Sequence, residues 1–538
     1  MLLHVIVFVT GGAILALELL ASRIMTPYFG VSLYIWTGIL SITLVALAIG
    51  YWAGGRLAAG RSGRPMSEDA LLRIFGLMPA VASLAIVAAC LAYPFLFYHL
   101  ARLDLVAGAF AACLILLLVP LIATSAMNPL LVALLAQRRV AGGPLADAGA
   151  GRVFFISTIG SVAGVVVTAF GLIPYLSNFT ATLIVAALLA VLPLVLLLRK
   201  ALPARARRPV AVTAGVALAA SLGLLAAADA YIGRLWPAFY AGQAWTLEAN
   251  YRSMFGTVKV LKTAPRADGR FERMYFQDGL VQNVVDSSHK SSSMYTYALE
   301  ALSYTHRPDL RSALVLGMGA GMVPMRLAER GVRVDAVDID PASLRASAER
   351  FGFDATRVRA FQADARTFLR NCDGGYDVVV IDLFHGDGVP DYLITRDFFH
   401  DLKRCLGDRG IAVFNTFADL EHPKPYAHFL TTLRSELPEI LLYRPDYGTA
   451  THINSFIVAA ARPLAAPSGP QDFSHAPARH QAILAAMLRS PRQIDGKLLE
   501  HGRIITDARN AMSADFAASQ MMNRRYVVDA VPAAFLVN

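Results

Sequence analysis

The sequence predicts two parts of different character, a multi-pass α-helical membrane domain followed by an α/β domain. Long apolar segments succeed one another through residues 1–231, whereas the remainder has the composition of a globular protein. Of the 538 residues, 56% are hydrophobic and 16% charged, against averages of about 45–50% and about 25% in soluble proteins. In the second part, apolar segments of strand length alternate with helical segments, which is typical of a parallel sheet with helices on both faces.

Seven segments have the composition of a membrane span, which needs about 20 mostly apolar residues. The first lacks a basic leader and is followed by further spans, so we expect a retained helix and not a cleaved signal. The fourth is too long for one straight helix, and Pro120 with Asn128-Pro129 predicts a kink or a re-entrant break. The spans cover approximately residues 3–26, 34–55, 71–98, 105–136, 153–172, 179–198 and 210–230.

Two charged residues fall within the first span, and charges inside a membrane are functional candidates. Arg23 is near the end of the span, where its side chain can extend to the interface beside Pro27. Glu18 lies deeper, and it belongs either to a structural ion pair or to a substrate contact.

The segment after the last span predicts a change from membrane to aqueous surroundings. Residues 232–250 are rich in Trp and Tyr, which suits an interfacial linker at the level of the lipid headgroups. Alternating residues then predict strands within 251–262 and 272–285, and Asp278-Gly279, inside the second segment, predicts a hairpin. We therefore expect a small N-terminal β subdomain at 251–300.

Five further strands are predicted within residues 301–462, with helical segments between them, and 463–538 forms a linker and a helical tail. Because strands and helices alternate, this region is expected to be a Rossmann-like α/β domain. The strands lie near residues 313–317, 333–338, 358–362, 376–382 and 410–415.

A nucleoside site is predicted at the carboxyl ends of the first three of these strands. Gly317, Gly319 and Gly321 form a tight turn in which backbone N–H groups can approach a ligand. Asp338 ends the second strand, where a carboxylate can bind both ribose hydroxyls. Asp364 closes the third strand, where it can accept a hydrogen bond from an adenine amino group. The dinucleotide pattern requires glycine or alanine where this chain has Met322, which disfavours a nicotinamide or flavin cofactor.

At this point the chain resembles a known family, the polyamine aminopropyltransferases, which include spermidine synthase. It is more similar still to bacterial membrane proteins in which a hydrophobic N-terminal region is fused to a spermidine-synthase-like domain. The segments that carry the resemblance are L-A-L-E-L-L-A-S-R-I-M-T-P-Y-F-G (15–30), G-Y-W-A-G-G-R-L-A (50–58), Y-F-Q-D-G-L-V-Q-N (275–283) and Y-D-V-V-V-I-D-L-F-H-G-D-G-V-P-D-Y-L-I-T (376–395).

The resemblance implies an S-adenosylmethionine-methyltransferase-like fold and a transferase. Gln282 and Tyr295 would contact the cofactor or amine, Asp338 the ribose and Asp364 the adenine. In the family, an amine attacks the aminopropyl carbon of decarboxylated S-adenosylmethionine and methylthioadenosine is released. The family's members use a carboxylate to orient the cationic amine and accept its proton.

The chain departs from the family pattern at two acidic positions. Ala320 stands where the family's glycine loop has an aspartate that binds the amino group of the transferred chain. His385 stands at the position of the general-base aspartate, and Asp387 follows two residues later. Asp382, His385 and Asp387 are the predicted catalytic cluster.

Three functions follow as hypotheses. The first is an integral-membrane enzyme that transfers an aminopropyl group to putrescine or a related amine. The second keeps the pocket but uses S-adenosylmethionine itself, as a methyltransferase or related transferase, because Ala320 relaxes the demand for an aminopropyl amine. The third is a transporter whose soluble domain senses a nucleoside or polyamine.

No Cys/His cluster has metal spacing, so no metal is expected, and the four cysteines indicate no disulfide framework.

The formal charge of +10 is assigned to membrane-flanking Lys and Arg, since no nucleic-acid-binding module is evident. Partners are therefore the lipid bilayer and a small-molecule amine, and the oligomeric state stays open, a homo-oligomer included. We expect a multi-pass protein of the bacterial inner (plasma) membrane.

The basic loops at 56–73, 138–152 and 199–208 are cytoplasmic by the positive-inside rule. Seven spans would leave the α/β domain outside the cytoplasm. An eighth span, formed if 105–136 is split into two, would place the domain in the cytoplasm. Adenosyl chemistry slightly favours this cytoplasmic placement.

Overall fold

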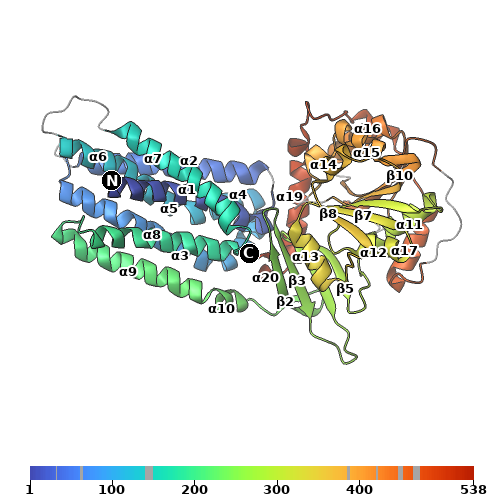
Figure 1. The fold of residues 1–538 in the computed structure, drawn as a ribbon, viewed down its shortest axis with the longest axis horizontal. Coiled ribbons are helices and arrows are strands. Elements are labelled where there is room, and N and C mark those ends of the chain that lie inside the picture. The colour runs from blue at the N-terminus through green and yellow to red at the C-terminus, as the bar shows by residue number, and fades with distance from the viewer. Residues whose placement is uncertain are drawn as a thin grey trace. The chain divides into compact units, whose positions relative to one another are not determined.

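The computed structural model describes residues 1–31, 33–60, 65–139, 149–383, 388–419, 422–445, 452–464 and 473–538. The chain divides into two compact units (Figure 1). Unit 1 contains Met1–Trp236 and Val528–Asn538, and unit 2 contains Pro237–Val527. The finer five-part division of the chain stays a prediction.

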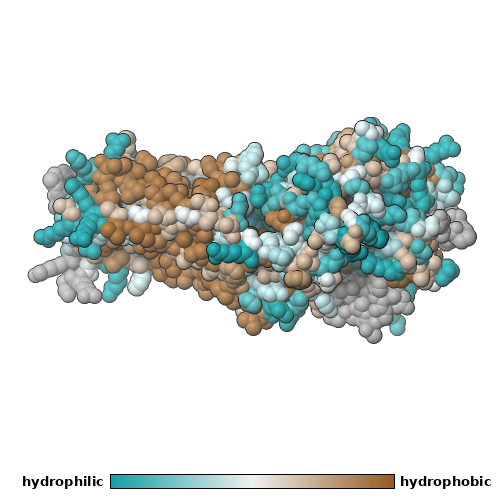
Figure 2. Space-filling model, turned by 90° about the horizontal axis from the view of Figure 1, so that it is seen from below, coloured by the Kyte–Doolittle hydropathy of each residue, from teal (hydrophilic) through white to brown (hydrophobic). Residues whose placement is uncertain are grey.

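Unit 1 is a bundle of long apolar helices. Among the described residues, seven helical segments are long and apolar enough to cross a membrane. Large apolar side chains on these helices face outward, such as Trp36, Trp52 and Phe155, and Figure 2 shows hydrophobic surface over this bundle. Such a surface suits contact with lipid. The helices are α1 (Leu2–Phe29), α2 (Leu33–Ala59), α3 (Glu68–Leu103), α4 (Leu105–Cys113), α5 (Val119–Ser125), α6 (Met127–Arg139), α7 (Ala150–Val167), α8 (Asn178–Leu198), α9 (Ala204–Ala226) and the short α10 (Ala228–Gly233).

By length and composition, the fourth segment is one candidate span, from Leu105 to Arg138. The chain passes from α4 through a π-helical turn, Leu114–Leu118, into α5, and a single residue, Ala126, separates α5 from α6. Pro120 lies in the first turn of α5, where a missing N–H is tolerated. The predicted irregularity is therefore present as a change of helix type within this segment.

Helices α1 and α7 pack unusually closely through small residues. A Cβ atom on Gly160 would lie 2.0 Å from the carbonyl oxygen of Phe8, so only glycine fits there. One turn earlier, Ser157 accepts a hydrogen bond from the buried Asn128 amide of α6, at 3.2 Å. Close backbone approach and buried polar pairs both stabilise helix association in an apolar solvent.

Unit 2 begins with an antiparallel meander of the order β1-β2-β3-β4-β5. Its strands are β1 (Ala238–Tyr240), β2 (Gln243–Arg252), β3 (Thr257–Thr263), β4 (Glu272–Gln277) and β5 (Leu280–Asp286). The hairpin predicted at Asp278-Gly279 joins β4 and β5, and both residues have positive φ. β1 and most of β2 occupy residues that the sequence assigns to the interfacial linker. Trp245 is only 2% exposed, so at this position the aromatic residue packs inside the protein.

The larger sheet of unit 2 has the strand order β11-β12-β10-β9-β6-β7-β8 among the described residues. β6 (Ser312–Leu316), β7 (Arg333–Asp338), β8 (Val358–Gln362), β9 (Tyr376–Ile381) and β10 (Leu406–Asp419) are parallel. β11 (Glu439–Tyr443) and β12 (His452–Ala460) complete it as antiparallel strands. The five predicted strands correspond to β6–β10. The chain moves outward from β6 in both directions, which places a topological switch point between β6 and β9.

Helices cover both faces of this sheet. One core packs alternate residues such as Val315 and Val380 against α11 (Met294–His306), α12 (Met322–Glu329) and α17 (Ala478–Arg489). The other packs their neighbours, such as Leu316 and Ile381, against α14 (Ala365–Arg370), α15 (Arg396–Cys405) and α16 (Pro423–Glu436). Strands buried on both faces explain the continuous apolar runs in the sequence. The remaining helices are α13 (Pro341–Arg350), η3 (Asp391–Leu393), α18 (Gly496–Glu500), α19 (Met512–Ala530) and α20 (Ala533–Leu536).

The expectation of no disulfide is wrong for one pair of cysteines. Cys372 and Cys405 form a disulfide, with their Cα atoms 5.6 Å apart. Cys372 follows α14 and Cys405 ends α15, so the packing of two neighbouring helices brings them together. Their separation of 33 residues matches no short spacing pattern, and the pairing therefore leaves no signal in the sequence.

Candidate functional site

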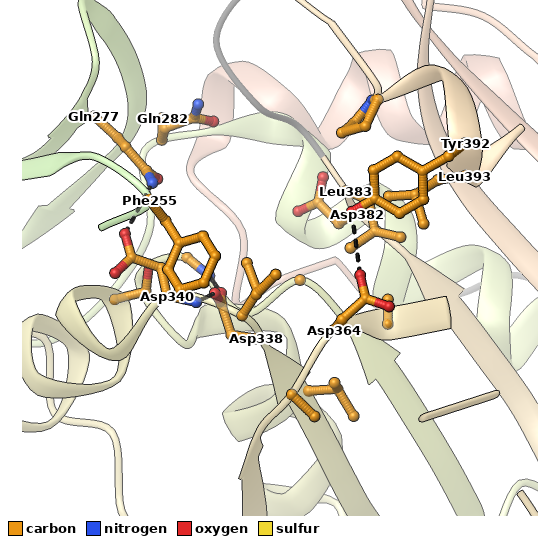
Figure 3. Close-up of a pocket in the computed structure, with 18 of the residues that line it drawn as sticks. Phe255, Gln277, Gln282, Asp338, Asp340, Asp364, Asp382, Leu383, Tyr392 and Leu393 are labelled. Atoms are coloured by element: carbon orange, nitrogen blue, oxygen red, sulfur yellow. Dashed lines mark hydrogen bonds between the residues drawn. The ribbon is translucent and has the colours of Figure 1, made fainter. Parts of the chain in front are cut away.

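A cavity of about 340 Å³ opens at the carboxyl ends of β6, β7, β8 and β9 (Figure 3). Ligands of α/β sheets bind at this edge, beside the switch point, and the volume falls within the range of about 300–1,000 Å³ found for small-molecule sites. The described lining residues are Phe255, Gln277, Gln282, Tyr295, Gly317, Gly319, Val337, Asp338, Ile339, Asp340, Ser343, Ala363, Asp364, Ala365, Asp382, Leu383, Pro390, Tyr392 and Leu393.

Gly317 and Gly319 form the floor of the cavity directly after β6. Gly317 has a φ of 86°, and a Cβ atom there would lie 2.1 Å from the carbonyl oxygen of Asp382. Gly319 has a φ of 49°, and its missing side chain leaves open space. A side chain at either position would therefore strain the backbone or block the approach of a ligand. Gly321 does not line the cavity, and it instead precedes α12 as its N-cap.

Asp338 connects the glycine turn to the end of β7. Its Oδ2 accepts hydrogen bonds from the backbone N–H groups of Met318, at 3.0 Å, and Gly319, at 3.4 Å. Its Oδ1 accepts one from the Asp340 N–H at 2.9 Å. Burial raises the pKa of the Asp338 carboxyl, although these N–H groups oppose the rise. The side chain is thus fixed in direction while it still borders the cavity.

A second carboxyl group, Asp340, lies beside Asp338 (Figure 3). Its Oδ1 caps α13 through the Ala342 N–H at 2.8 Å, and its Oδ2 accepts a longer hydrogen bond, 3.4 Å, from Gln277. Burial raises the pKa of Asp340 to about 6, and the nearby carboxylates add to this rise. Asp340 is absent from the predicted site residues, since an acid before Pro341 indicates only a helix cap.

Asp364 lies across the cavity from Asp338 and Asp340 in Figure 3. Its Oδ1 caps α14 by accepting from the Thr367 N–H at 2.8 Å. Its Oδ2 accepts a hydrogen bond from the Tyr392 hydroxyl at 3.1 Å. Asp364 therefore has two roles. It caps the N-terminus of α14, as an acid at the end of a strand often does, and it lines the cavity. Tyr392 is also absent from the predicted site residues, although it lies within the segment that carries the family resemblance.

Asp382 follows β9 and receives its hydrogen bond from the core of the sheet. The Asn415 amide of β10 donates to Asp382 Oδ1 at 2.8 Å, and the Asn454 amide of β12 donates to Asn415 Oδ1 at 3.1 Å. Burial raises the pKa of Asp382 to about 6, the Asp338 charge adds to the rise, and the Asn415 hydrogen bond opposes it. A carboxyl group that titrates near neutrality is suited to accept a proton.

Tyr295 and Gln282 line the same cavity from the helix and strand that precede the large sheet. The Tyr295 hydroxyl accepts a hydrogen bond from the Asn283 amide at 3.3 Å, and Ser291 holds Asn283 through a hydrogen bond of 2.7 Å. Burial, followed by the Asp382 charge, raises the pKa of Tyr295, which keeps its phenol protonated.

Of the ten predicted site residues, seven line the cavity, two are not described, and Gly321 lies outside the lining as the N-cap of α12. The two that lie outside the described residues are His385 and Asp387. The residues that line it are Gln282, Tyr295, Gly317, Gly319, Asp338, Asp364 and Asp382. Their roles stay predictions.

Comparison with known proteins finds relatives that match part of this chain. A family model described as a methyltransferase domain matches residues 313–410. A polyamine aminopropyltransferase of Vibrio vulnificus is 31% identical over 152 residues, which is 27% of this chain and 49% of that protein. The predicted resemblance to polyamine aminopropyltransferases is confirmed.

Further relatives also match part of the chain. A polyamine aminopropyltransferase of Thermoplasma volcanium is 26% identical over 181 residues, 32% of this chain and 64% of that protein. A solved structure of a probable spermidine synthase from Corynebacterium glutamicum has 16% identity and a TM-score of 0.36, covering 40% of this chain and 81% of that one. The chain thus spans about half of the length of one of these aminopropyltransferases and a little under two thirds of the other. The methyltransferase-domain match over residues 313–410 supports the methyltransferase-like, Rossmann-like fold predicted for this part of unit 2.

Proposed function

We propose that the protein is an integral-membrane aminopropyltransferase-like enzyme whose cavity binds an adenosyl sulfonium donor. One observation carries this proposal: the cavity is lined by four carboxyl groups, and its described lining contains no Lys or Arg. Such a cavity attracts a cation and repels the phosphates of a dinucleotide or nucleotide. Decarboxylated S-adenosylmethionine carries positive charge at both its sulfur and its amino group, and the polyamine acceptor is also a cation.

In this proposal the residues divide between holding the nucleoside and handling the amine. Asp338 would bind the ribose hydroxyls, and Asp364 with Tyr392 would meet the adenine. The open backbone at Gly319 would lie against the nucleoside. Asp382, with Gln282 and Tyr295 beside it, would face the reacting end of the donor. The side chains of Phe255 and Leu393 supply the apolar surface that a purine needs.

The reaction would be a direct transfer between two bound molecules. The nitrogen lone pair of putrescine or a related amine forms a bond to the aminopropyl carbon, the carbon–sulfur bond breaks, and its electron pair stays on sulfur as methylthioadenosine is released. The new ammonium then loses a proton, for which Asp382 is the proposed acceptor. A pKa of about 6 for Asp382 leaves it ionised at pH 7 and able to hold a cationic amine in place.

Purified full-length protein in detergent tests the proposal directly. We expect methylthioadenosine to be released only when both decarboxylated S-adenosylmethionine and a di- or polyamine are present. The Asp382→Asn variant, which keeps the shape of the side chain, should bind the donor but release product at least ~100-fold more slowly. No release with any amine from the wild-type protein would reject the proposal.

A second candidate is a methyltransferase that uses S-adenosylmethionine itself. The methyltransferase-domain match over residues 313–410 favours it, as does Ala320, which places no acid where the resemblance would have one. Calorimetry with the two donors separates these candidates. A clear preference for the decarboxylated form would eliminate the methyltransferase, and a preference for S-adenosylmethionine would favour it.

A further inference from the structure

The basic residues of unit 1 gather at one end of its bundle. The junctions from α2 to α3, α6 to α7 and α8 to α9 each join two consecutive long helices, which run in opposite directions (Figure 1). These junctions therefore share an end, which we call the basic end, and Figure 2 shows hydrophilic surface there. Among the described residues, the Lys and Arg residues in or beside these junctions are Arg56, Arg73, Arg138, Arg139, Arg152, Arg199, Lys200, Arg205, Arg207 and Arg208.

The other end of the bundle carries far fewer basic residues and holds both chain connections to unit 2. Arg102, in the last turn of α3, forms an ion pair with Asp529 at 3.2 Å. The Phe179 N–H, in the first turn of α8, donates to the Asn538 carbonyl at 3.3 Å. The segment 528–538 is therefore fixed to the end where α3 finishes and α8 begins.

The outgoing connection lies at this same end. Trp236, which closes the first part of unit 1, stacks on Phe535 of the returning segment with ring centroids 5.7 Å apart. One long helix, α9, separates this point from the basic residues at 199–208. If α9 crosses a membrane, the basic residues and unit 2 are on opposite sides, whatever the number of helices before it.

The disulfide of unit 2 is an independent observation on its surroundings. Cys372 and Cys405 are cross-linked, whereas Cys90 and Cys113, in helices of unit 1, are free and buried. Disulfides form and persist in oxidising compartments and are rare in the cytosol. A structural disulfide in unit 2 thus indicates the non-cytoplasmic side, and the positive-inside rule places the basic end in the cytoplasm.

We propose that unit 2, with its acidic cavity, functions on the non-cytoplasmic face of the membrane. There a thiol–disulfide oxidant of that compartment accepts the two electrons and two protons released when the Cys372 and Cys405 thiols join. This reverses the slight preference for the cytoplasm that rested on adenosyl chemistry alone. The inference depends on membrane insertion of unit 1 and not on the transfer reaction. Under the proposed function, the cationic donor and amine must both be present at that face, since a charged sulfonium does not cross an apolar bilayer unaided.

Labelling of introduced cysteines in intact cells tests the sidedness. Lys290→Cys places a thiol at an exposed turn of unit 2, and Arg205→Cys places one at an exposed position of the basic end. A membrane-impermeant maleimide should label Lys290→Cys in intact cells and Arg205→Cys only after permeabilisation. The opposite pattern would overturn the proposal, as would labelling of both thiols only after permeabilisation.

Thiol trapping of the unmodified full chain provides a second measurement that needs no variant. Cells are quenched in acid and denatured, and free thiols are alkylated before and after reduction. Cys372 and Cys405 should react only after reduction, and Cys90 and Cys113 before it. Alkylation of all four cysteines without reduction would overturn the proposal. Neither measurement depends on catalysis, so failure of the proposed function would leave both results interpretable.

Discussion

Replacing Asp382 by asparagine is expected to make unit 2 more stable at neutral pH while it slows transfer at least ~100-fold. Burial raises the pKa of this carboxyl from 3.8 to about 6, and a tenfold change in an acid dissociation constant corresponds to about 1.4 kcal/mol. The ionised carboxylate therefore destabilises the folded state by about 3 kcal/mol at pH 7. Asparagine removes this charge but keeps an oxygen that can accept the Asn415 hydrogen bond.

The sign of the pH dependence follows from proton binding. Between about pH 4 and pH 6 the folded protein retains the Asp382 proton that the unfolded chain has lost, so the free energy of unfolding falls as pH rises through this window. The advantage of Asp382→Asn over the wild type should thus be complete at about pH 7.5, about half as large at about pH 5, and absent below about pH 4.

The opposite end of the same strand offers a matched control. Burial opposes the ionisation of Asp377, but Arg307, at 2.8 Å, and the N–H groups of Arg311 and Ser312 outweigh it and lower its pKa. Asp377→Asn should therefore destabilise the protein at about pH 7.5, with the loss shrinking as pH falls below the ordinary aspartate pKa. Two neutralisations on one strand are expected to have opposite signs.

Thermal unfolding of the full-length protein in detergent measures both effects. Trp245, 2% exposed in the β2 strand, reports on unit 2 by its fluorescence. A gain of about 3 kcal/mol corresponds to about 5 °C in the midpoint for a domain of the size of unit 2, Pro237–Val527. If Asp382→Asn melts at or below the wild-type temperature at neutral pH, or if its gain is equally large in mild acid, the burial argument is wrong.

Three further outcomes test the site. Asp364→Ser should keep the α14 cap, change the free energy of unfolding by no more than about 0.5 kcal/mol and weaken adenosyl binding about tenfold, whereas Asp364→Ala should also lose about 1 kcal/mol of stability. Calorimetry measures the binding and thermal melting the stability, and wild-type binding by Asp364→Ser would assign Asp364 to the cap alone. Asn415→Leu removes the hydrogen bond that favours the ionised form of Asp382, so the acid limb of the pH–rate profile should move to higher pH by about 1 pH unit. A reduced rate with an unmoved acid limb would give Asn415 a packing role only. Affinity for the cationic donor should increase between mildly acidic and neutral pH as Asp340 and Asp382 ionise, while affinity for uncharged methylthioadenosine changes little; parallel curves for the two ligands would refute electrostatic recognition.

Much of unit 2 was predictable because its strands are short apolar runs bounded by glycine and acid. β6 to β9 fall within one or two residues of the predicted ranges, and the spacing from Gly317 to Asp338 is that of a nucleoside site. The β1 and β2 strands could not be predicted because Trp245 and its neighbours suit a membrane interface as well as a small sheet. The disulfide could not be predicted because only the packing of α14 against α15 brings its two cysteines together.

The parts of the site that escaped prediction are those that depend on sheet order. Asn415 lies 33 residues after Asp382, and nothing in the sequence states that β10 pairs with β9 or that β12 adds Asn454 behind it. Once those strands are neighbours, the Asn454 amide donates to Asn415, and the Asn415 amide donates to Asp382. These hydrogen bonds stabilise the Asp382 carboxylate at the switch point, where burial disfavours its charge. Similarly, Asp338 and Asp364 belong to different strands, and only the parallel pairing of β7 with β8 brings both to one edge. The acidity of the cavity, on which its preference for a cationic ligand depends, is therefore a property of the fold's topology and not of any single motif.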